Sequence, residues 1–139
     1  MEELALLHPL WKKNKVVAVW LFGSRARGEA REDSDWDLAL LFKQPYPGLQ
    51  EKMSLIADVT GILKTDKVDI VFLHDAPLVL QKEIVYDGKV IFETDWDFRT
   101  DFEEMVVRRW LDFEPVWQQM TRDLLENLKE EFGGGESGL

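Results

Sequence analysis

The sequence predicts an α+β (α/β) fold, in which a small mixed sheet of about four strands carries packed helices and is followed by C-terminal helices. Three observations favour this fold. Residues 16–22 form a continuous apolar run, which is typical of a strand buried on both faces. Residues 49–63 place apolar side chains at close to helical spacing. Beyond residue 94, aromatic and aliphatic side chains recur among charged ones at helical intervals.

Turn residues mark the limits of the elements in the first half of the chain. Gly23 and Ser24 stop the apolar run abruptly, and the prolines and glycine at 45–48 stop the next one. The expected elements are a short amphipathic helix at 3–11, a strand at 16–22, a turn or single helical turn at 25–30, and a strand at 35–42.

The second half continues the alternation of helices and strands. Pro77 suits the first turn of a helix and Gly88 suits its end, so a helix is expected between them. Asp69 is the only charged residue in an otherwise apolar run. The expected elements are a helix at 49–63, a strand at 68–73, a helix at 77–87, and a strand at 89–93.

The C-terminal part is expected to be helical from about residue 98, as an extension of a single domain that spans residues 1–132. We expect Pro115 to break this stretch into two helices, because proline cannot donate the backbone hydrogen bond that a helix interior needs. Residues 133–139 are glycine-rich and have little apolar surface to bury, so they are expected to form a mobile tail.

Composition argues against several classes of function. The chain has 139 residues, of which 45% are hydrophobic, and this suffices for one domain with a buried core. It has no cysteine for disulfides or thiolate zinc sites, and no apolar run near the roughly 20 residues that span a bilayer. The formal net charge of -10 would repel a phosphate backbone, so no direct nucleic-acid partner is expected. We expect a soluble cytoplasmic protein.

Two aspartates stand at the entrance of the second strand. Side chains at positions i and i+2 of a strand point to the same face, so Asp35 and Asp37 present two carboxylates side by side, while Trp36 points to the other face. Two like charges this close are tolerated when a divalent cation lies between them. Oxygen ligands without histidine or cysteine favour Mg²⁺ or Mn²⁺ over zinc. The alternative is an acidic strand end that faces solvent.

Asp69 strengthens the metal hypothesis. An isolated carboxylate inside an apolar strand is costly to desolvate unless it is paired or binds a metal. If its strand lies beside the second one, Asp35, Asp37 and Asp69 converge and can hold two metal ions roughly 3.5–4 Å apart. The alternative is a strand-end aspartate paired with Lys67 or Lys64.

A phosphate-binding turn is expected next to these carboxylates. Glycine lets the backbone approach a ligand closely, so Gly23 and Ser24 can contact phosphate oxygens through backbone N–H groups and the serine hydroxyl. Arg25 and Arg27 could add charge-assisted hydrogen bonds to the same oxygens. Gly-Ser alone is a common turn, but this one follows a buried strand and precedes the paired aspartates by a short loop.

Three segments together carry a resemblance to a known family. They are residues 23–28 (GSRARG), 34–38 (SDWDL) and 68–71 (VDIV). They resemble the minimal nucleotidyltransferases of the polymerase-beta-like superfamily, and the similarity extends over roughly residues 10–115. The resemblance implies the polymerase-beta-like nucleotidyltransferase fold, and every catalytic position of the family's motif is filled.

More closely, the sequence is similar to the MntA-type antitoxins of HEPN/MNT toxin-antitoxin pairs. Members of that group transfer AMP from ATP to a tyrosine hydroxyl of the HEPN ribonuclease toxin, which silences the toxin. The resemblance implies that Asp35 and Asp37 ligate two Mg²⁺ ions, and that Asp69 ligates the catalytic ion and helps to deprotonate the hydroxyl. It also implies that Gly23 and Ser24 hold the β and γ phosphates, and that the chain forms a hetero-oligomer with the toxin.

Two alternatives stay open on the sequence alone. One is a binding module that neutralises a toxin by covering its active site, and the other is a nucleotidyltransferase for a small-molecule hydroxyl. The chain has no evident second domain to enclose a small acceptor, which favours a protein substrate. A basic ribonuclease surface would complement the net charge of -10.

Some aromatic residues have two interpretations. Large aromatic side chains in the C-terminal stretch could anchor a partner, or they could simply pack on the sheet. His8 and His74 are expected to be turn residues that take no part in the site. The aromatic residues in question are Phe98, Phe102, Trp110, Phe113 and Trp117.

Overall fold

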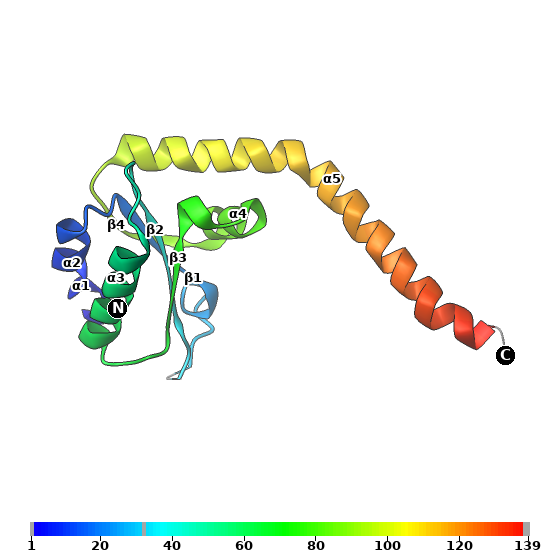
Figure 1. The fold of residues 1–139 in the computed structure, drawn as a ribbon, viewed down its shortest axis with the longest axis horizontal. Helices are drawn as coiled ribbons and strands as arrows, with labels where there is room; N and C mark the ends of the chain where they lie inside the picture. The colour runs from blue at the N-terminus through cyan, green and yellow to red at the C-terminus, as the bar shows by residue number, and fades with distance from the viewer. Residues whose placement is uncertain (1, 32, 138–139) are drawn as a thin grey trace.

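The computed structural model describes residues 2–31 and 33–137, with side chains as far as residue 132. The chain forms a four-stranded sheet with the order β3-β2-β1-β4, which carries helices on both faces (Figure 1). The sheet matches the expected strands to within two residues at each end. The strands are β1 (Ala18–Phe22), β2 (Trp36–Leu41), β3 (Val68–Phe72) and β4 (Lys89–Glu93).

The directions of the strands bring the termini of three strands together at one end of the sheet. β1 pairs antiparallel with β2 and β4, whereas β2 pairs parallel with β3 and is joined to it by α3 (Leu49–Leu63). The end of β1 therefore meets the beginnings of β2 and β3. Across these three strands the register places Phe22, Asp37 and Asp69 in one row.

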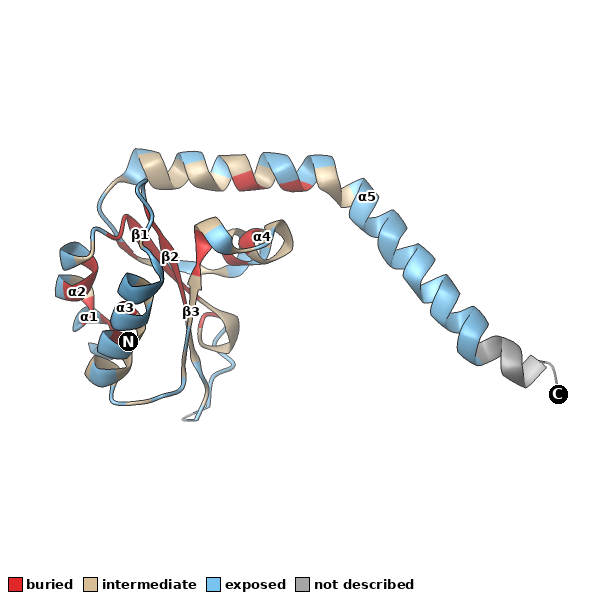
Figure 2. Cartoon of the chain, viewed as in Figure 1, coloured by how far each residue is buried: buried red, intermediate tan, exposed pale blue. Residues whose placement is uncertain are grey.

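One face of the sheet packs against the N-terminal helices and α3. The helices α1 (Glu2–Ala5) and α2 (His8–Lys13) bury Leu4, Leu10 and Trp11 against alternate strand residues, among them Leu38. Figure 2 shows in red the buried parts of these helices and of the central strands. This face carries the side chains that alternate with Asp37 and Asp69.

The opposite face packs against α4 (Leu78–Asp87) and the first part of α5 (Trp96–Ser137). Trp20, Ala39 and Val71 lie in this layer together with Phe98 and Phe102 of α5. Because side chains two residues apart share a face, Asp37 and Asp69 belong to this face, at its uncovered end.

The N-terminal segment is two short helices, not the single helix expected over residues 3–11. A continuous helix would need the amide of residue 9 to donate to the carbonyl of Ala5, and Pro9 has no N–H. Instead, the amides of Leu6 and Leu7 close tight turns on Glu3 and Leu4, and the second helix begins at His8.

The C-terminal helix is continuous, so the expected break at Pro115 is wrong. α5 contains Pro115 in its interior, and Figure 1 shows the helix changing direction where its colour turns from yellow to orange. Proline removes one hydrogen bond from a helix and bends it. Ring contacts bridge the proline, because Trp117 lies 6.4 Å from Trp110 and 6.3 Å from Phe113 between ring centroids. These contacts let the bent helix continue.

In the described part of the chain, no helix has both the length and the apolar character needed to cross a membrane. Of the mobile tail expected at residues 133–139, residues 133–137 continue α5, and residues 138–139 lie outside the described residues.

Candidate active site

The row across β1, β2 and β3 positions the predicted carboxylates. Asp37 is half-buried and stands directly opposite Asp69 in the parallel register, whereas Asp35 precedes β2 and is exposed. Trp36 packs among the side chains of the other face, as expected from its position between the two aspartates. β3 is an edge strand, so Asp69 lies at the open side of the sheet.

The charges of the three carboxylates interact. Burial raises the pKa of Asp37, and the nearby negative charges of Asp69 and Asp35 raise it further, while Arg27 and Arg25 oppose the shift. Among the residues that the structure describes, none of the three carboxylates has an ion-pair partner. Neighbouring negative charges that have no ion-pair partner suit the binding of a cation.

Asp69 differs from the buried carboxylate that its apolar strand suggested. Its side chain is exposed, because β3 is at the edge of the sheet and this end of the strand is not covered. The expected desolvation cost is therefore absent. Pairing with lysine does not occur either, since the Lys67 ammonium donates to the carbonyl oxygen of Asp33 at 3.2 Å and Lys64 forms no ion pair in the described chain.

A metal centre is not preformed. In the described residues, no three acidic, histidine or cysteine side chains lie close enough together to hold an ion as they stand. The donor set nevertheless fits Mg²⁺, because it consists of carboxylate oxygens only. Asp37 and Asp69 are adjacent, and Asp35 is exposed and unpaired, so packing does not hold its side chain away from them.

Gly23 is the residue that the site geometry requires most strictly. Its φ angle is +74°, and a Cβ atom added to it would lie 2.1 Å from Oδ2 of Asp37. Glycine therefore allows the turn after β1 to approach the carboxylate. The turn is a short 3-10 helix, Gly23–Arg25, in which Ser24 is half-buried and its hydroxyl makes no hydrogen bond with the described residues.

The two arginines lie in different surroundings. The Arg25 guanidinium donates to the carbonyl oxygen of Ser34 from Nε at 3.2 Å and from Nη2 at 2.8 Å, and it stacks 3.8 Å above the Trp36 ring. Arg25 thus ties the turn to the start of β2 and is already occupied. Arg27 is exposed and pairs with Glu29 at 3.1 Å.

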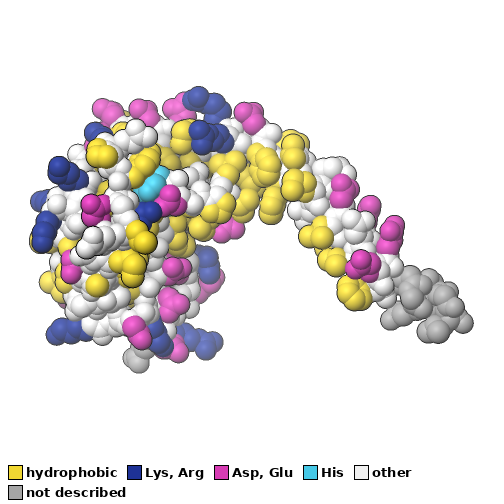
Figure 3. Space-filling view, viewed as in Figure 1, with side chains coloured by type: hydrophobic (Ala, Val, Ile, Leu, Met, Phe, Trp, Pro, Cys, Tyr) yellow, Lys and Arg dark blue, Asp and Glu magenta, His cyan; other side chains and the backbone are white. Residues whose placement is uncertain are grey.

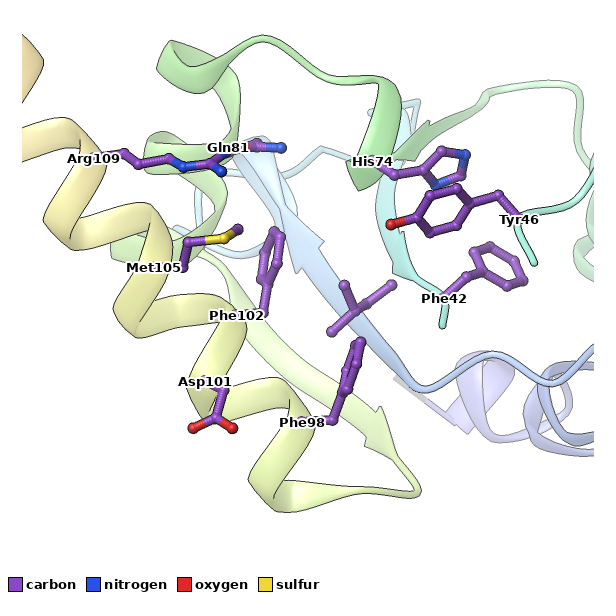
Figure 4. A pocket seen from close by; sticks show the side chains of 10 residues that line it. Phe42, Tyr46, His74, Gln81, Phe98, Asp101, Phe102, Met105 and Arg109 are labelled. Carbon is purple, nitrogen blue, oxygen red and sulfur yellow. The ribbon is translucent and has the colours of Figure 1, made fainter. Parts of the chain in front are cut away.

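The structure also holds a cavity that the sequence did not indicate. It has a volume of about 480 Å³ and lies between α4, α5 and the far end of β2, away from Asp37. Figure 4 shows Phe98 and Phe102 of α5 on one side and Tyr46 stacked on His74 on the other, with ring centroids 4.0 Å apart. Burial lowers the pKa of His74. His74 lies in the turn after β3, as expected, whereas His8 is the first residue of α2 and not a turn residue.

Comparison with known proteins assigns the family. A family model described as polymerase beta, nucleotidyltransferase, matches residues 6–97. The chain belongs to this nucleotidyltransferase family. The matched residues contain all four strands and every residue of the candidate site, so the mixed sheet with its long C-terminal helix is a polymerase-beta-like nucleotidyltransferase fold.

Relatives of this nucleotidyltransferase include protein adenylyltransferase MntA of Aphanizomenon flos-aquae. It is 29% identical over 121 residues, which cover 81% of this chain and 80% of the relative. A chain in a crystal structure of a toxin-antitoxin with AMP-PNP matches the fold with a TM-score of 0.76 at 24% identity, covering 90% of this chain and 99% of that chain.

A further structural match is a chain in the complex of a tri-AMPylated HEPN toxin of Shewanella oneidensis with an MNT antitoxin. The TM-score is 0.67 at 21% identity, and the match covers 88% of this chain and 98% of that chain. Both structural matches include part of the long C-terminal helix, since the coverage extends well beyond the residues of the family model.

Proposed function

We propose that this nucleotidyltransferase is the antitoxin of a toxin-antitoxin pair and transfers AMP from ATP to a tyrosine hydroxyl of a cognate HEPN ribonuclease toxin. The observation that carries the proposal is the row in which Asp37 faces Asp69, with Gly23 against Asp37. Ser24 follows in the same turn, and its hydroxyl makes no hydrogen bond with the described residues. The adenylyltransferase relative and the toxin-antitoxin structures support AMP as the transferred group and a protein as the acceptor.

In this strand order, the expected binding sites of ATP and of the acceptor would lie on opposite sides of Asp37. The turn at Gly23 and Ser24 follows β1 and would hold the triphosphate, whereas Asp69 stands on the edge strand, where a side chain of another protein can reach it. Asp37 lies between them on β2. Arg27 would add charge near the phosphates, and Arg25 would act by fixing the loop that precedes β2.

Asp35, Asp37 and Asp69 would hold the Mg²⁺ ions. When bound, these ions would neutralise charge on the phosphates and favour the deprotonated acceptor. The transfer forms a bond between the tyrosine oxygen and the α-phosphorus of ATP. It breaks the bond from that phosphorus to the oxygen bridging to the β-phosphate, so that pyrophosphate leaves. Asp69 would accept the hydroxyl proton, because it lies on the acceptor side of the row.

The decisive experiment incubates the protein with Mg²⁺, ATP labelled at the α-phosphate, and the product of the neighbouring gene. Label should appear on a tyrosine of that protein, and Asp37→Asn or Asp69→Asn should reduce labelling at least a hundredfold. Asp66→Asn is the matched control, because Asp66 is an exposed aspartate just before β3 that lies outside the row. Removal of divalent ions by a chelator should abolish labelling in the wild type.

Other outcomes would contradict the proposal. If Asp37→Asn still neutralises the toxin and the wild type leaves no label, neutralisation occurs by occlusion. If label appears only on small hydroxyl compounds, the acceptor is not a protein. In both cases the assignment to a protein adenylyltransferase is wrong.

A further inference from the structure

The second half of α5 leaves the body of the molecule. We call residues 116–132 the arm. Figure 3 shows the arm projecting away from the sheet and helices, with hydrophobic side chains along the side that borders the open space between arm and body. Every residue of the arm is exposed.

The arm carries an apolar stripe that continues a buried one. In the first half of α5, Phe102, Val106 and Trp110 face the sheet and α4, at the spacing of one helical face. The same spacing of three or four residues continues beyond Pro115 without a covering partner. We call these exposed residues the arm stripe, and they are Val116, Trp117, Met120, Leu124 and Leu128.

A contiguous exposed stripe of this kind is typical of a protein interface. The arm of 17 residues is about 25 Å long, which allows a second helix to pack along it. Within the molecule, α4 provides such a contact for the first half of α5. Within the described chain no helix covers the arm stripe in this way, so a helix of another chain is needed to cover it.

The charge of the arm indicates what kind of chain can supply this helix. Four acidic residues accompany two basic ones in the arm, and the whole chain has a formal net charge of -10. Two arms packed together would place like charges beside each other, which opposes self-association. A helix with an apolar face flanked by lysine and arginine complements the arm.

The arm also faces the side of the body that carries the turn after β1. In Figure 1 the turn after β1, drawn in light blue, lies on the side of the body that faces the arm across the open space. A partner held on the arm stripe would occupy this space, and it would have one surface on the helix and another toward the carboxylate row. This geometry concentrates acceptor hydroxyls near Asp69.

We propose that the arm stripe is the docking surface for the acceptor protein, which contributes a helix whose apolar face is flanked by basic residues. The inference rests on the proposed function for the identity of the acceptor. Docking and transfer are nevertheless separate properties, because the stripe lies outside the carboxylate row. Loss of the stripe should therefore weaken acceptor binding and leave nucleotide binding intact.

The test compares two substitutions of the same residue type on the same helix. Leu124→Glu alters the stripe, and Leu111→Glu is the matched control, because the two leucines are 57% and 59% exposed and lie on different faces of α5. For each variant we would measure the Kd of the acceptor, the Kd of a non-hydrolysable ATP analogue, and AMP transfer over a range of acceptor concentrations. Circular dichroism would check that each variant folds.

Leu124→Glu should raise the Kd and the KM for the acceptor by about tenfold to a hundredfold, which corresponds to the burial of one leucine. The Kd of the ATP analogue and kcat at saturating acceptor should stay within about twofold of the wild type, and Leu111→Glu should resemble the wild type throughout. Loss of acceptor binding in Leu124→Glu would support docking even if the wild type transfers no AMP, so the two proposals can fail separately.

Three results would overturn the docking proposal. The first is equal acceptor affinity in Leu124→Glu and the wild type, and the second is no acceptor binding by the wild type. The third is a wild-type chain that is dimeric in sedimentation and that Leu124→Glu converts to a monomer, because a second copy would then occupy the stripe.

Discussion

Among single residues, Gly23 and Gly28 form a natural pair for comparison. Both have a φ angle of +74°, but an added Cβ would collide with Oδ2 of Asp37 at position 23 and would meet nothing within 4 Å at position 28. The backbone conformation costs an alanine about 1–2 kcal/mol at either position. Only the substitution at Gly23 also displaces the carboxylate.

We predict that Gly23→Ala and Gly28→Ala both lower the free energy of unfolding by about 1–2 kcal/mol, and that only Gly23→Ala abolishes AMP transfer. Urea denaturation measures the first effect, and transfer of labelled AMP measures the second. Full activity in Gly23→Ala would show that Asp37 does not need its present position.

His74 predicts a dependence of stability on pH. Its lowered pKa results from burial, which favours the neutral imidazole in the folded state. Below the usual pKa of 6.5 the unfolded chain binds a proton at this position more readily than the folded chain, so stability is lost as the pH falls through this range.

We therefore expect the wild type to lose more stability between pH 7.5 and pH 5.5 than the variant His74→Gln does. Urea unfolding of both proteins at the two pH values measures the difference. The carboxylates that titrate at lower pH are common to both proteins and cancel in the comparison. An equal loss in the two proteins would show that His74 titrates normally in the fold.

At the scale of elements, the loop between β1 and β2 is held by Arg25. Its guanidinium joins the carbonyl of Ser34 to the ring of Trp36, and both contacts depend on the planar shape of the group. Arg25→Lys should lower the free energy of unfolding by about 1–2 kcal/mol. Arg27→Lys should change it by less than about 0.5 kcal/mol, because Arg27 is exposed.

Steady-state kinetics can distinguish a role of Arg25 in bracing the loop between β1 and β2 from a direct contact of Arg25 with phosphate. A bracing Arg25 predicts reduced stability with a KM for ATP close to the wild-type value once the protein is folded. A stable Arg25→Lys variant with a KM for ATP raised tenfold would instead assign the guanidinium to the triphosphate.

The elements themselves could be predicted because their signals are local. The strands are apolar runs bounded by turn residues, and α3 has the bounds that its spacing indicated. Pro9 could have revealed the division of the N-terminal helix. Pro115 could not be interpreted in the same way, because contacts between Trp110, Phe113 and Trp117 offset the local cost of proline and depend on the folded helix.

For the candidate site, the sequence shows the residue types and their spacing but not their surroundings. Asp35 and Asp37 share a face because of their spacing, which is visible in the sequence. The alignment of Asp69 with Asp37 depends on which strands pair and in which register. The exposure of Asp69 follows from the place of β3 at the sheet edge, and no local pattern determines that place.

At the scale of the whole molecule, the net charge of -10 predicts that association with a basic partner depends on salt. We expect the association rate with the acceptor to fall roughly tenfold between low and high ionic strength, while the dissociation rate changes less. Stopped-flow mixing at several salt concentrations measures both rates. An association rate that is indifferent to salt would contradict electrostatic attraction.

The proline inside α5 gives the long helix a pivot. Pro115 cannot donate to the carbonyl of Leu111, so the two halves of the helix are joined by one hydrogen bond fewer than elsewhere. A rotation of about 10° at this point carries the tip of a segment about 25 Å long through about 4 Å. If the acceptor docks on the arm stripe as proposed, this displacement would bring more than one of its hydroxyl groups within reach of the carboxylate row.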